Sequence, residues 1–156
     1  MIVVRPSEPG DDAAAKAVDA LATATLRATY RPNKAALANK ARIAARLNRL
    51  VAASDGLVVG TVRWYLDNEC VRILGLGVHP DFYRQGIARE LVAHLGAIAR
   101  KQGATRLRLW TVKETGNVDI FARLGFHVVA EREDQFSESE THPKLIEVEM
   151  EKPLNG

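Results

Sequence analysis

The sequence has few of the residues that stabilise small proteins through covalent or metal cross-links. Cys70 is the single cysteine among 156 residues, so an internal disulfide is excluded. The four histidines, His79, His94, His127 and His142, are scattered and show no spacing typical of zinc ligands. We therefore expect neither a structural nor a catalytic metal.

Long apolar runs and low-complexity tracts are also missing. No apolar stretch approaches the ~20 residues that a membrane helix needs, and the first residues do not resemble a signal peptide. Apolar residues make up 47% of the chain and charged residues 26%, as in ordinary globular proteins. These features predict a single domain over residues 1–156, cytoplasmic and without membrane partners.

The excess of positive charge is small, with a formal net charge of +3. It favours anionic partners without choosing between nucleic acid and a phosphate-bearing small molecule. In the densest basic stretch, Arg42, Arg46 and Arg49 fall on one face of a predicted helix, without the interleaved aromatic residues of many nucleic-acid binders. We interpret this face as solvated and expect no nucleic-acid partner.

The hydrophobic periodicity predicts an α/β fold of the α+β type. It indicates a strand at residues 2–5, helices at 13–29 and 34–49, and strands at 51–53, 57–66 and 71–78 joined by tight turns. An amphipathic helix follows Pro80 and ends at Gln102-Gly103, before a strand at 106–111, a short helix at 118–124, and strands at 126–132 and 144–150. The loop at 133–143 has no regular apolar period. The predicted order is β-α-α-β-β-β-α-β-α-β-β, with about seven strands and four helices.

Residues 74–89 form a strand, a turn and the start of a helix. The first amides of a helix lack internal partners and carry partial positive charge, so they bind phosphate oxygens readily. Gly86 and Ala88 keep the turn open, and Arg84 and Arg89 can add charged contacts. Neither a Walker-type loop nor a dinucleotide glycine triplet is present. The alternative to an anion site is an ordinary glycine-containing loop.

The strand, Val78-x-Pro80, Phe82 and Gln85-Gly86-Ile87-Ala88 before an amphipathic helix resemble the cofactor motif of the GNAT superfamily of acyl-CoA N-acyltransferases. Residues 121–126, which end in Gly-Phe, resemble the second signature of that superfamily. The element order is similar to that fold over nearly the whole chain. The resemblance implies a mixed, mostly antiparallel sheet that is splayed between its fourth and fifth strands.

The resemblance also implies that acetyl-CoA is the cosubstrate and that the acceptor is a small-molecule or peptide amine, which attacks directly in a ternary complex. It assigns three groups of cofactor-binding residues: Leu76, Gly77 and Val78 along the pantetheine; the amides of Arg84, Gln85, Gly86, Ile87, Ala88 and Arg89 at the pyrophosphate; and Asn117 and Phe121 beside the pantetheine or adenine.

The sequence indicates the catalytic groups less clearly than the cofactor-binding residues. By the resemblance, the amide of Val78 stabilises the oxyanion. An alkyl amine with a pKa near ~10.4 must lose a proton before it attacks, and Glu69 and Glu114 are the candidate bases, although solvated surface carboxylates are the alternative reading. Phe121 stands where the superfamily often has an acidic tyrosine, so Tyr83 or water is the candidate acid.

Other readings stay open at this point. The absence of an evident base, together with Phe121, is also compatible with a catalytically silent acyl-CoA-binding or partner-binding module. The acidic loop at 135–143 would favour a cationic amine if it borders the acceptor site. An exposed sheet edge would allow a homodimer. The sequence identifies neither the acceptor amine nor the preferred acyl chain.

Overall fold

A computed structural model describes residues 1–155 of the chain. Seven strands form one sheet in the order β1-β3-β4-β5-β6-β9-β7. In that order they are β1 (Ile2–Pro6), β3 (Asn48–Ser54), β4 (Leu57–Asp67), β5 (Cys70–Val78), β6 (Arg106–Val112), β9 (Ile146–Pro153) and β7 (His127–Glu133). The helices are α1 (Asp12–Thr23), α2 (Lys34–Ile43), α3 (Ile87–Lys101) and α4 (Asn117–Arg123). The predicted fold class and element order are confirmed.

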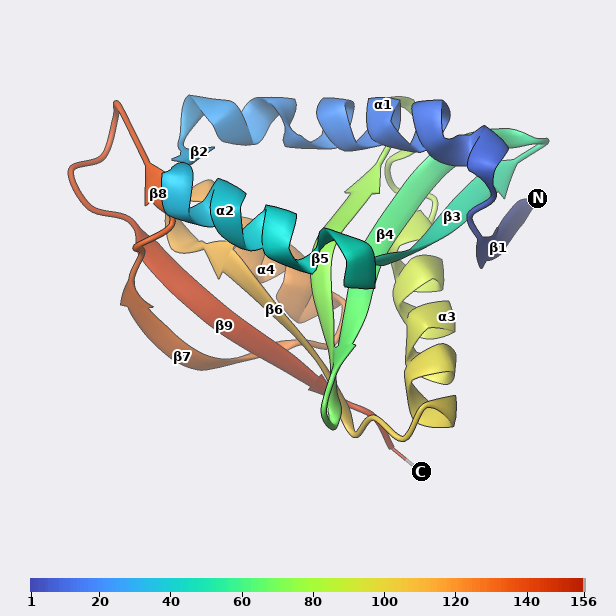
Figure 1. The fold of residues 1–156 in the computed structure, drawn as a ribbon. Coiled ribbons are helices and arrows are strands. Elements are labelled where there is room, and N and C mark those ends of the chain that lie inside the picture. Colours follow the sequence, from blue (N-terminus) through green and yellow to red (C-terminus); the bar gives the residue numbers. More distant parts are fainter. Residues whose placement is uncertain (156) are drawn as a thin grey trace.

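Helices cover the sheet on both sides (Figure 1). Helices α1 and α2 lie on one side of the central strands, and α3 and α4 lie on the other. The main core lies between the sheet and α3, where Leu91 and Leu95 are fully buried with Val62 and Val71. In the part of the chain that the structure describes, no helix is both long and apolar enough to cross a membrane.

The sheet opens between β5 and β6, which are its only parallel neighbours within residues 1–155. Their ladder has three pairs, which end with Arg72 opposite Arg108. Beyond this point β6 pairs with β9, and β5 pairs with β4 alone. The predicted splay between the fourth and fifth strands is therefore confirmed.

Helix α1 is docked on β4 and β5 by residues at helical spacing. Ala15 and Val18 are buried. Ala22 lies so close to β5 that a Cβ on Gly77 would come within 2.8 Å of its Cβ. Asp19 belongs to the same stripe, which places a carboxylate against the sheet.

A bidentate ion pair fixes the chain between β1 and α1. Arg5 donates to both oxygens of Asp11, at 2.7 and 3.0 Å. These hydrogen bonds, together with one from the Glu8 amide, lower the pKa of Asp11 to about 2. The start of α1 is thereby tied to the edge of the sheet.

The second predicted helix was too long. Helix α2 ends at Ile43 and continues as a short 3-10 helix (Ala44–Arg46), and β3 already begins at Asn48. Arg49 is therefore in a strand, where its Nη1 donates to Asp19 and Thr61. The predicted helical face that included Arg49 was wrong.

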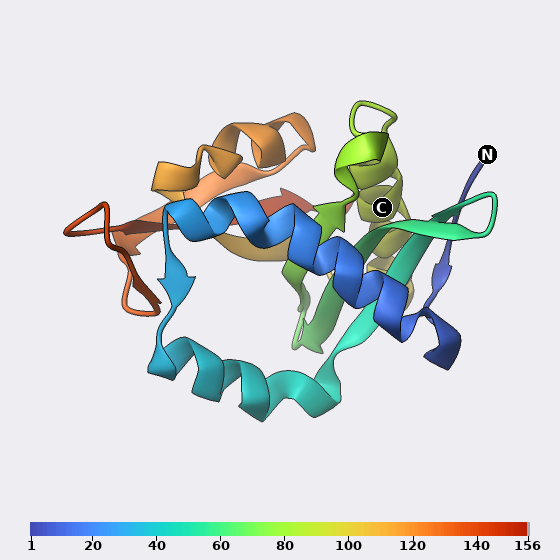
Figure 2. The ribbon, with the colours of Figure 1, turned by 90° about the horizontal axis from the view of Figure 1, so that it is seen from above.

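A two-stranded ladder was missed in the predicted loop at 133–143. β2 (Arg31–Pro32) pairs antiparallel with β8 (Ser137–Glu138). Asn33 strengthens this contact, because its amide donates to the Phe136 carbonyl and its side chain donates to the Gln135 carbonyl. The connection between α1 and α2 is thereby joined to the segment between β7 and β9, and the two segments lie side by side when seen from above (Figure 2).

Candidate active site

The edge of β5 that faces β6 carries free backbone groups beyond the short parallel ladder. The amide of His79 donates to the carbonyl of Val59 at 2.7 Å, in register with the pairs along β4 and β5. Because hydrogen-bonded and non-hydrogen-bonded pairs alternate in an antiparallel ladder, the N–H and C=O groups of Leu76 and Val78 point away from β4. They face the opening that β6 leaves.

The turn before α3 continues from this edge. Arg84 and Gly86 have positive φ angles, 65° and 75°. No backbone amide in residues 84–89 donates to an acceptor within the described chain. The side chain of Ile87 is 2% exposed and belongs to the core, so this residue offers only its amide. The result is a cluster of free N–H groups at a helix N-terminus, which suits an anion.

Glycine at position 86 is required by the backbone and not by crowding. A Cβ on Gly86 would meet no other atom within 4 Å. A side chain in the left-handed conformation costs roughly 1–2 kcal/mol, which glycine avoids. The predicted role of Gly86 in keeping the turn open thus has a conformational basis.

A cleft of about 470 Å³ opens beside the free edge of β5. Leu76 and Gly77 form part of its wall, and Asn117 and Phe121 reach it from α4. The ring of Phe121 packs edge-on against Phe126, with 6.0 Å between centroids. The structure thus brings together four of the residues predicted to bind the cofactor, from two elements, β5 and α4.

On the other side of the cleft lie charged residues that the sequence analysis did not select. Asp19 from α1, Lys40 from α2 and Arg63 from β4 all line it. Oδ2 of Asp19 lies 3.1 Å from Arg49 Nη1 and 3.8 Å from Arg63 Nε. The pKa of Lys40 lies below its ordinary value, chiefly because of burial and then because of the positive charge of Arg63.

A buried acidic residue also borders the cleft from β9. Glu147 is 7% exposed, and its Oε1 accepts a hydrogen bond from Arg132 Nε at 2.7 Å. The Arg132 guanidinium lies 5.9 Å from the ring centroid of Trp110, and that of Arg72 lies 4.1 Å from the same centroid. Glu147 is thus neutralised by its partner, and Trp110, which lines the cleft, stacks on Arg72, which lines a second hollow.

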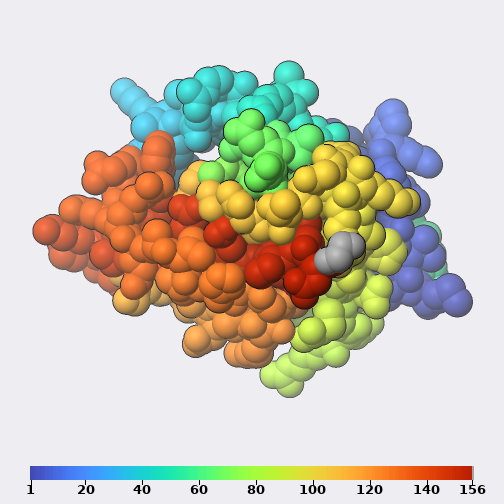
Figure 3. Space-filling view, turned by 90° about the horizontal axis from the view of Figure 1, so that it is seen from below, coloured from blue at the N-terminus to red at the C-terminus, as the bar shows by residue number. Residues whose placement is uncertain are grey.

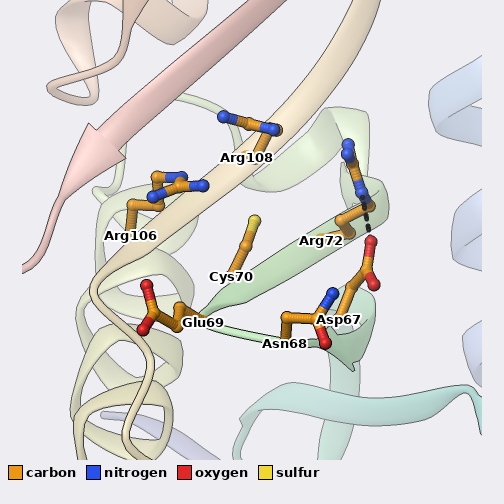
Figure 4. Close-up of a pocket in the computed structure, with 7 residues that line it drawn as sticks. All are labelled: Asp67, Asn68, Glu69, Cys70, Arg72, Arg106 and Arg108. Carbon is orange, nitrogen blue, oxygen red and sulfur yellow. Dashed lines mark hydrogen bonds and ion pairs between the residues drawn. The ribbon is translucent and has the colours of Figure 1, made fainter.

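The second hollow, of about 610 Å³, contains Glu69 and Cys70. It lies by the turn between β4 and β5, which protrudes on the lower side of the molecule (Figure 3). Arg72, Arg106 and Arg108 surround it, with Arg72 paired to Asp67 (Figure 4).

The position of Glu69 contradicts its predicted role as the base. Glu69 precedes the first residue of β5, whereas Val78 is the last, so roughly 30 Å of extended chain separates them. Cys70 is 4% exposed, and burial raises the pKa of its thiol. Neither residue reaches the free edge of β5.

Three other predicted residues are engaged elsewhere or lie outside the cleft lining. Glu114 Oε1 accepts from the Ile146 amide at 2.9 Å, which gives this carboxylate a structural role. Tyr83 is 55% exposed on the turn before α3. The guanidinium of Arg89 donates to the Arg123 carbonyl, so it joins α3 to α4.

The sequence did contain a signal for Asp19. Its spacing from Ala15, Val18 and Ala22 is that of one helical stripe, and a charge in a sheet-facing stripe is uncommon unless it has partners. Leu21, which lies two residues beyond Asp19 and outside this stripe, is 46% exposed. The cationic lining had no comparable signal, because it comes from separate elements.

Solved acetyltransferases share this fold at low sequence identity. The ribosomal-protein-S18-alanine N-acetyltransferase from Escherichia coli matches with a TM-score of 0.76 and 19% identity, over 100% of this chain and 96% of that chain. An acetyltransferase from Bacillus subtilis in complex with CoA gives 0.73 and 15%, over 99% and 100%. A GNAT family acetyltransferase from Elizabethkingia anophelis with acetyl-CoA bound gives 0.72 and 17%, over 98% of each chain.

A comparison with curated protein sequences gives no match. The family model for the acetyltransferase (GNAT) family matches residues 15–126. The matched region runs from α1 to Phe126 and includes both motifs, the free edge of β5 and the turn before α3. The chain therefore belongs to the acetyltransferase (GNAT) family.

Proposed function

We propose that the protein is an N-acetyltransferase that transfers an acetyl group from acetyl-CoA to a primary amine by direct attack in a ternary complex. One observation carries this proposal: the free edge of β5 continues directly into the cluster of free amides at residues 84–89, beside the cleft. Two proteins of the same fold are described with CoA or acetyl-CoA bound, which supports the choice of cosubstrate.

The residues present fit acetyl-CoA as a cosubstrate. The free N–H and C=O groups of Leu76 and the C=O group of Val78 would hydrogen-bond the amide groups of a pantetheine arm in the manner of an added strand, which leaves the Val78 N–H for the thioester carbonyl. The amides of residues 84–89 and the exposed guanidinium of Arg84 would hold the pyrophosphate. Arg89 would contribute its amide, because its guanidinium already contacts α4.

Asp19 takes the place of Glu69 as our candidate base. Its Oδ1 would lie 3.9 Å from a Cβ on Gly77, and this oxygen has no hydrogen-bond partner within the described residues. It would accept the proton of the amine directly or through water. The amide of Val78 would donate to the carbonyl oxygen as negative charge develops there, a contribution of roughly 3 kcal/mol for one such donor.

Departure of the thiolate would proceed without an acid at position 121. Phe121 has no hydroxyl group, and a thiol with a pKa near ~8.5 leaves tolerably without protonation. The buried Cys70 lies at the far end of β5 and would not relay the acetyl group. Direct attack by the amine is therefore the simplest route.

Thermal unfolding with acetyl-CoA, free coenzyme A or ATP tests the cosubstrate site. A ligand at a hundred times its dissociation constant adds about 2.7 kcal/mol to stability. We expect both coenzyme A species to raise Tm in the wild type, and ATP to have a smaller effect. In Gly86→Glu the rise should vanish, because the new carboxylate lies among the free amides and the turn is strained.

Gly103→Glu is the matched control. Gly103 lies just beyond the C-terminus of α3, has a φ of 82°, and a Cβ there would also meet nothing within 4 Å. Both variants should lose similar stability, and only Gly86→Glu should lose the response to coenzyme A. An equal rise in Tm with coenzyme A in the two variants would refute the assigned site. Binding of coenzyme A without turnover of any amine would favour the catalytically silent acyl-CoA-binding module.

A further inference from the structure

The side of the cleft that faces α1 and α2 is unusually cationic. Four basic and two acidic residues line the whole cleft, namely Arg27, Lys40, Arg63, Arg132, Asp19 and Glu147. Glu147 and Arg132 pair with each other. Asp19 is shared between Arg63 and Arg49, and Arg49 adds a further positive charge behind it. The remaining lining therefore has an excess of positive charge.

Arg27, Lys40 and Arg63 have no carboxylate that is not shared with another cation, within the described residues. The Nε of Arg63 is buried, donates to no acceptor among the described residues, and lies too far from Asp19 for a hydrogen bond, at 3.8 Å. Lys40 and Arg27 have no carboxylate partner within residues 1–155. Like charges that converge in a cleft repel one another, and an anion placed between them would relieve this repulsion.

The charges are arranged in order along β5. A Cβ on Gly77 would lie 3.9 Å from Asp19 Oδ1, whereas a Cβ on Gly75 would lie 3.1 Å from the Arg63 guanidinium. Two residues of a strand span roughly 7 Å. The Asp19 carboxylate is thus next to the Val78 end of β5. The Arg63 guanidinium lies beside Gly75, two residues closer to the turn between β4 and β5.

We propose that the acceptor is a small primary amine that also carries an anionic group, a carboxylate or a phosphate, several bonds from the nitrogen. This inference rests on the proposed acetyl transfer. The amine end faces Asp19 and the edge of β5, and the anionic end is held by Arg63, Lys40 and Arg27. The acidic loop, which suggested a cationic amine, contributes the apolar Phe136 to the cleft. The acidic Glu138 and Glu140 of that loop are not part of the lining.

The test compares acceptors of equal length that differ only in charge. ω-Amino carboxylates of two to six carbons, the corresponding amides, diamines and aminoalkyl phosphates are assayed with acetyl-CoA. We expect kcat/KM to be at least roughly ten-fold higher for an anionic acceptor than for its amide, as a charged hydrogen bond provides, and lowest for the diamine. The carboxylate and phosphate series distinguish the two kinds of anion.

Lys40→Gln and Arg27→Gln should each reduce this preference by roughly ten-fold, mainly through KM, and leave the Tm response to coenzyme A unchanged. Lys34→Gln is the control, because Lys34 begins the same helix as Lys40 but does not line the cleft. If Lys34→Gln reduced the preference as much as Lys40→Gln, the effect would be one of net charge and the proposal would be wrong.

A binding measurement separates this inference from the proposed function. The N-acetylated carboxylate and its amide are titrated calorimetrically into the protein with coenzyme A present. Suppose that the carboxylate binds more tightly than the amide, that Lys40→Gln weakens this binding, and that no amine is turned over. This result would contradict the proposed acetyl transfer and support the anion site. Turnover that is equal or faster with the amide or diamine would overturn the anion site alone. An absence of any charge preference in both measurements would also overturn it.

Discussion

Gly77 allows α1 to lie directly against β5. A methyl group at this position would approach the Cβ of Ala22 to 2.8 Å, closer than Cβ atoms pack. The glycine therefore sets how deeply α1 sits, and with it the height of Asp19 above the free strand edge. A residue without a side chain thus positions the charge that we assign as the base.

We predict that Gly77→Ala lowers the free energy of unfolding by about 1–3 kcal/mol, as overpacking does. Acetyl transfer should fall as well, because α1 and Asp19 are pushed away from the cleft. Chemical denaturation and steady-state kinetics measure the two effects.

The partner variant Ala22→Gly removes the methyl group that is in the way, at a cost of about 1 kcal/mol in helix propensity. The double variant should be more stable than the sum of the two single changes indicates. Gly10→Ala is a neutral reference, because a Cβ there meets nothing within 4 Å. If Gly77→Ala and Ala22→Gly had additive effects on the free energy of unfolding, the close contact between these two residues would not limit the packing of α1 on β5.

At the scale of elements, the β2–β8 ladder holds the outer wall of the cleft. Asn33 serves both sides of this contact, because its Oδ1 accepts from the Ala36 amide at the start of α2 and its Nδ2 donates to the Gln135 carbonyl. Ser139 reinforces it from β8's side by donating to the Thr29 carbonyl. The position of α2, and with it Lys40, therefore depends on contacts between residues that are more than a hundred positions apart in the chain.

Asn33→Ala should lose about 1 kcal/mol of stability through the lost helix cap and should raise KM for the acceptor. Asn33→Asp keeps the capping oxygen and loses only the donor to Gln135, so it should retain most of the stability. Limited proteolysis should cut residues 134–142 faster in both variants, with the coenzyme A response preserved. If the protease cut residues 134–142 at the wild-type rate in both variants, the hydrogen bond from Asn33 to Gln135 would not be what holds the outer wall of the cleft.

The sequence predicted the elements with a strong period and missed those that tertiary pairing creates. β2 and β8 have two residues each, too few for any alternation to appear. The second helix was extended too far, to Arg49, although β3 already begins at Asn48. Pairing with β1 and β4 overrides the local pattern there.

The same distinction applies to the site. The turn before α3 is contiguous in sequence, so its glycine and its neighbours could be identified from local residue types. The acceptor side is assembled from α1, α2 and β4, and only Asp19 left a trace in the helical pattern. Glu69 was wrongly chosen as a candidate base because the sequence alone does not show which end of β5 faces the opening of the sheet.

For the whole molecule, hydrogen exchange followed by NMR should reveal where the cosubstrate binds. Saturating acetyl-CoA should slow exchange of the amides of Leu76, Val78 and residues 84–89, which are free in the described structure. The amides of residues 70–72, which lie in the parallel ladder, should change little. Protection centred on the second hollow near Glu69 would place the cosubstrate elsewhere and contradict our assignment.

The β2–β8 ladder also has a consequence for how the protein acquires its site during folding. The coenzyme A side is built between β4 and α4, from residues that follow one another along the chain. The acceptor side needs β8 to meet β2, a contact between Arg31 and Glu138, and contacts so distant in sequence form slowly. On the ribosome, a chain that has not yet reached β8 would already contain the turn that we assign to the pyrophosphate, but not the ladder that closes the proposed acceptor side. We therefore expect the proposed acceptor side to be completed later in synthesis than the turn before α3.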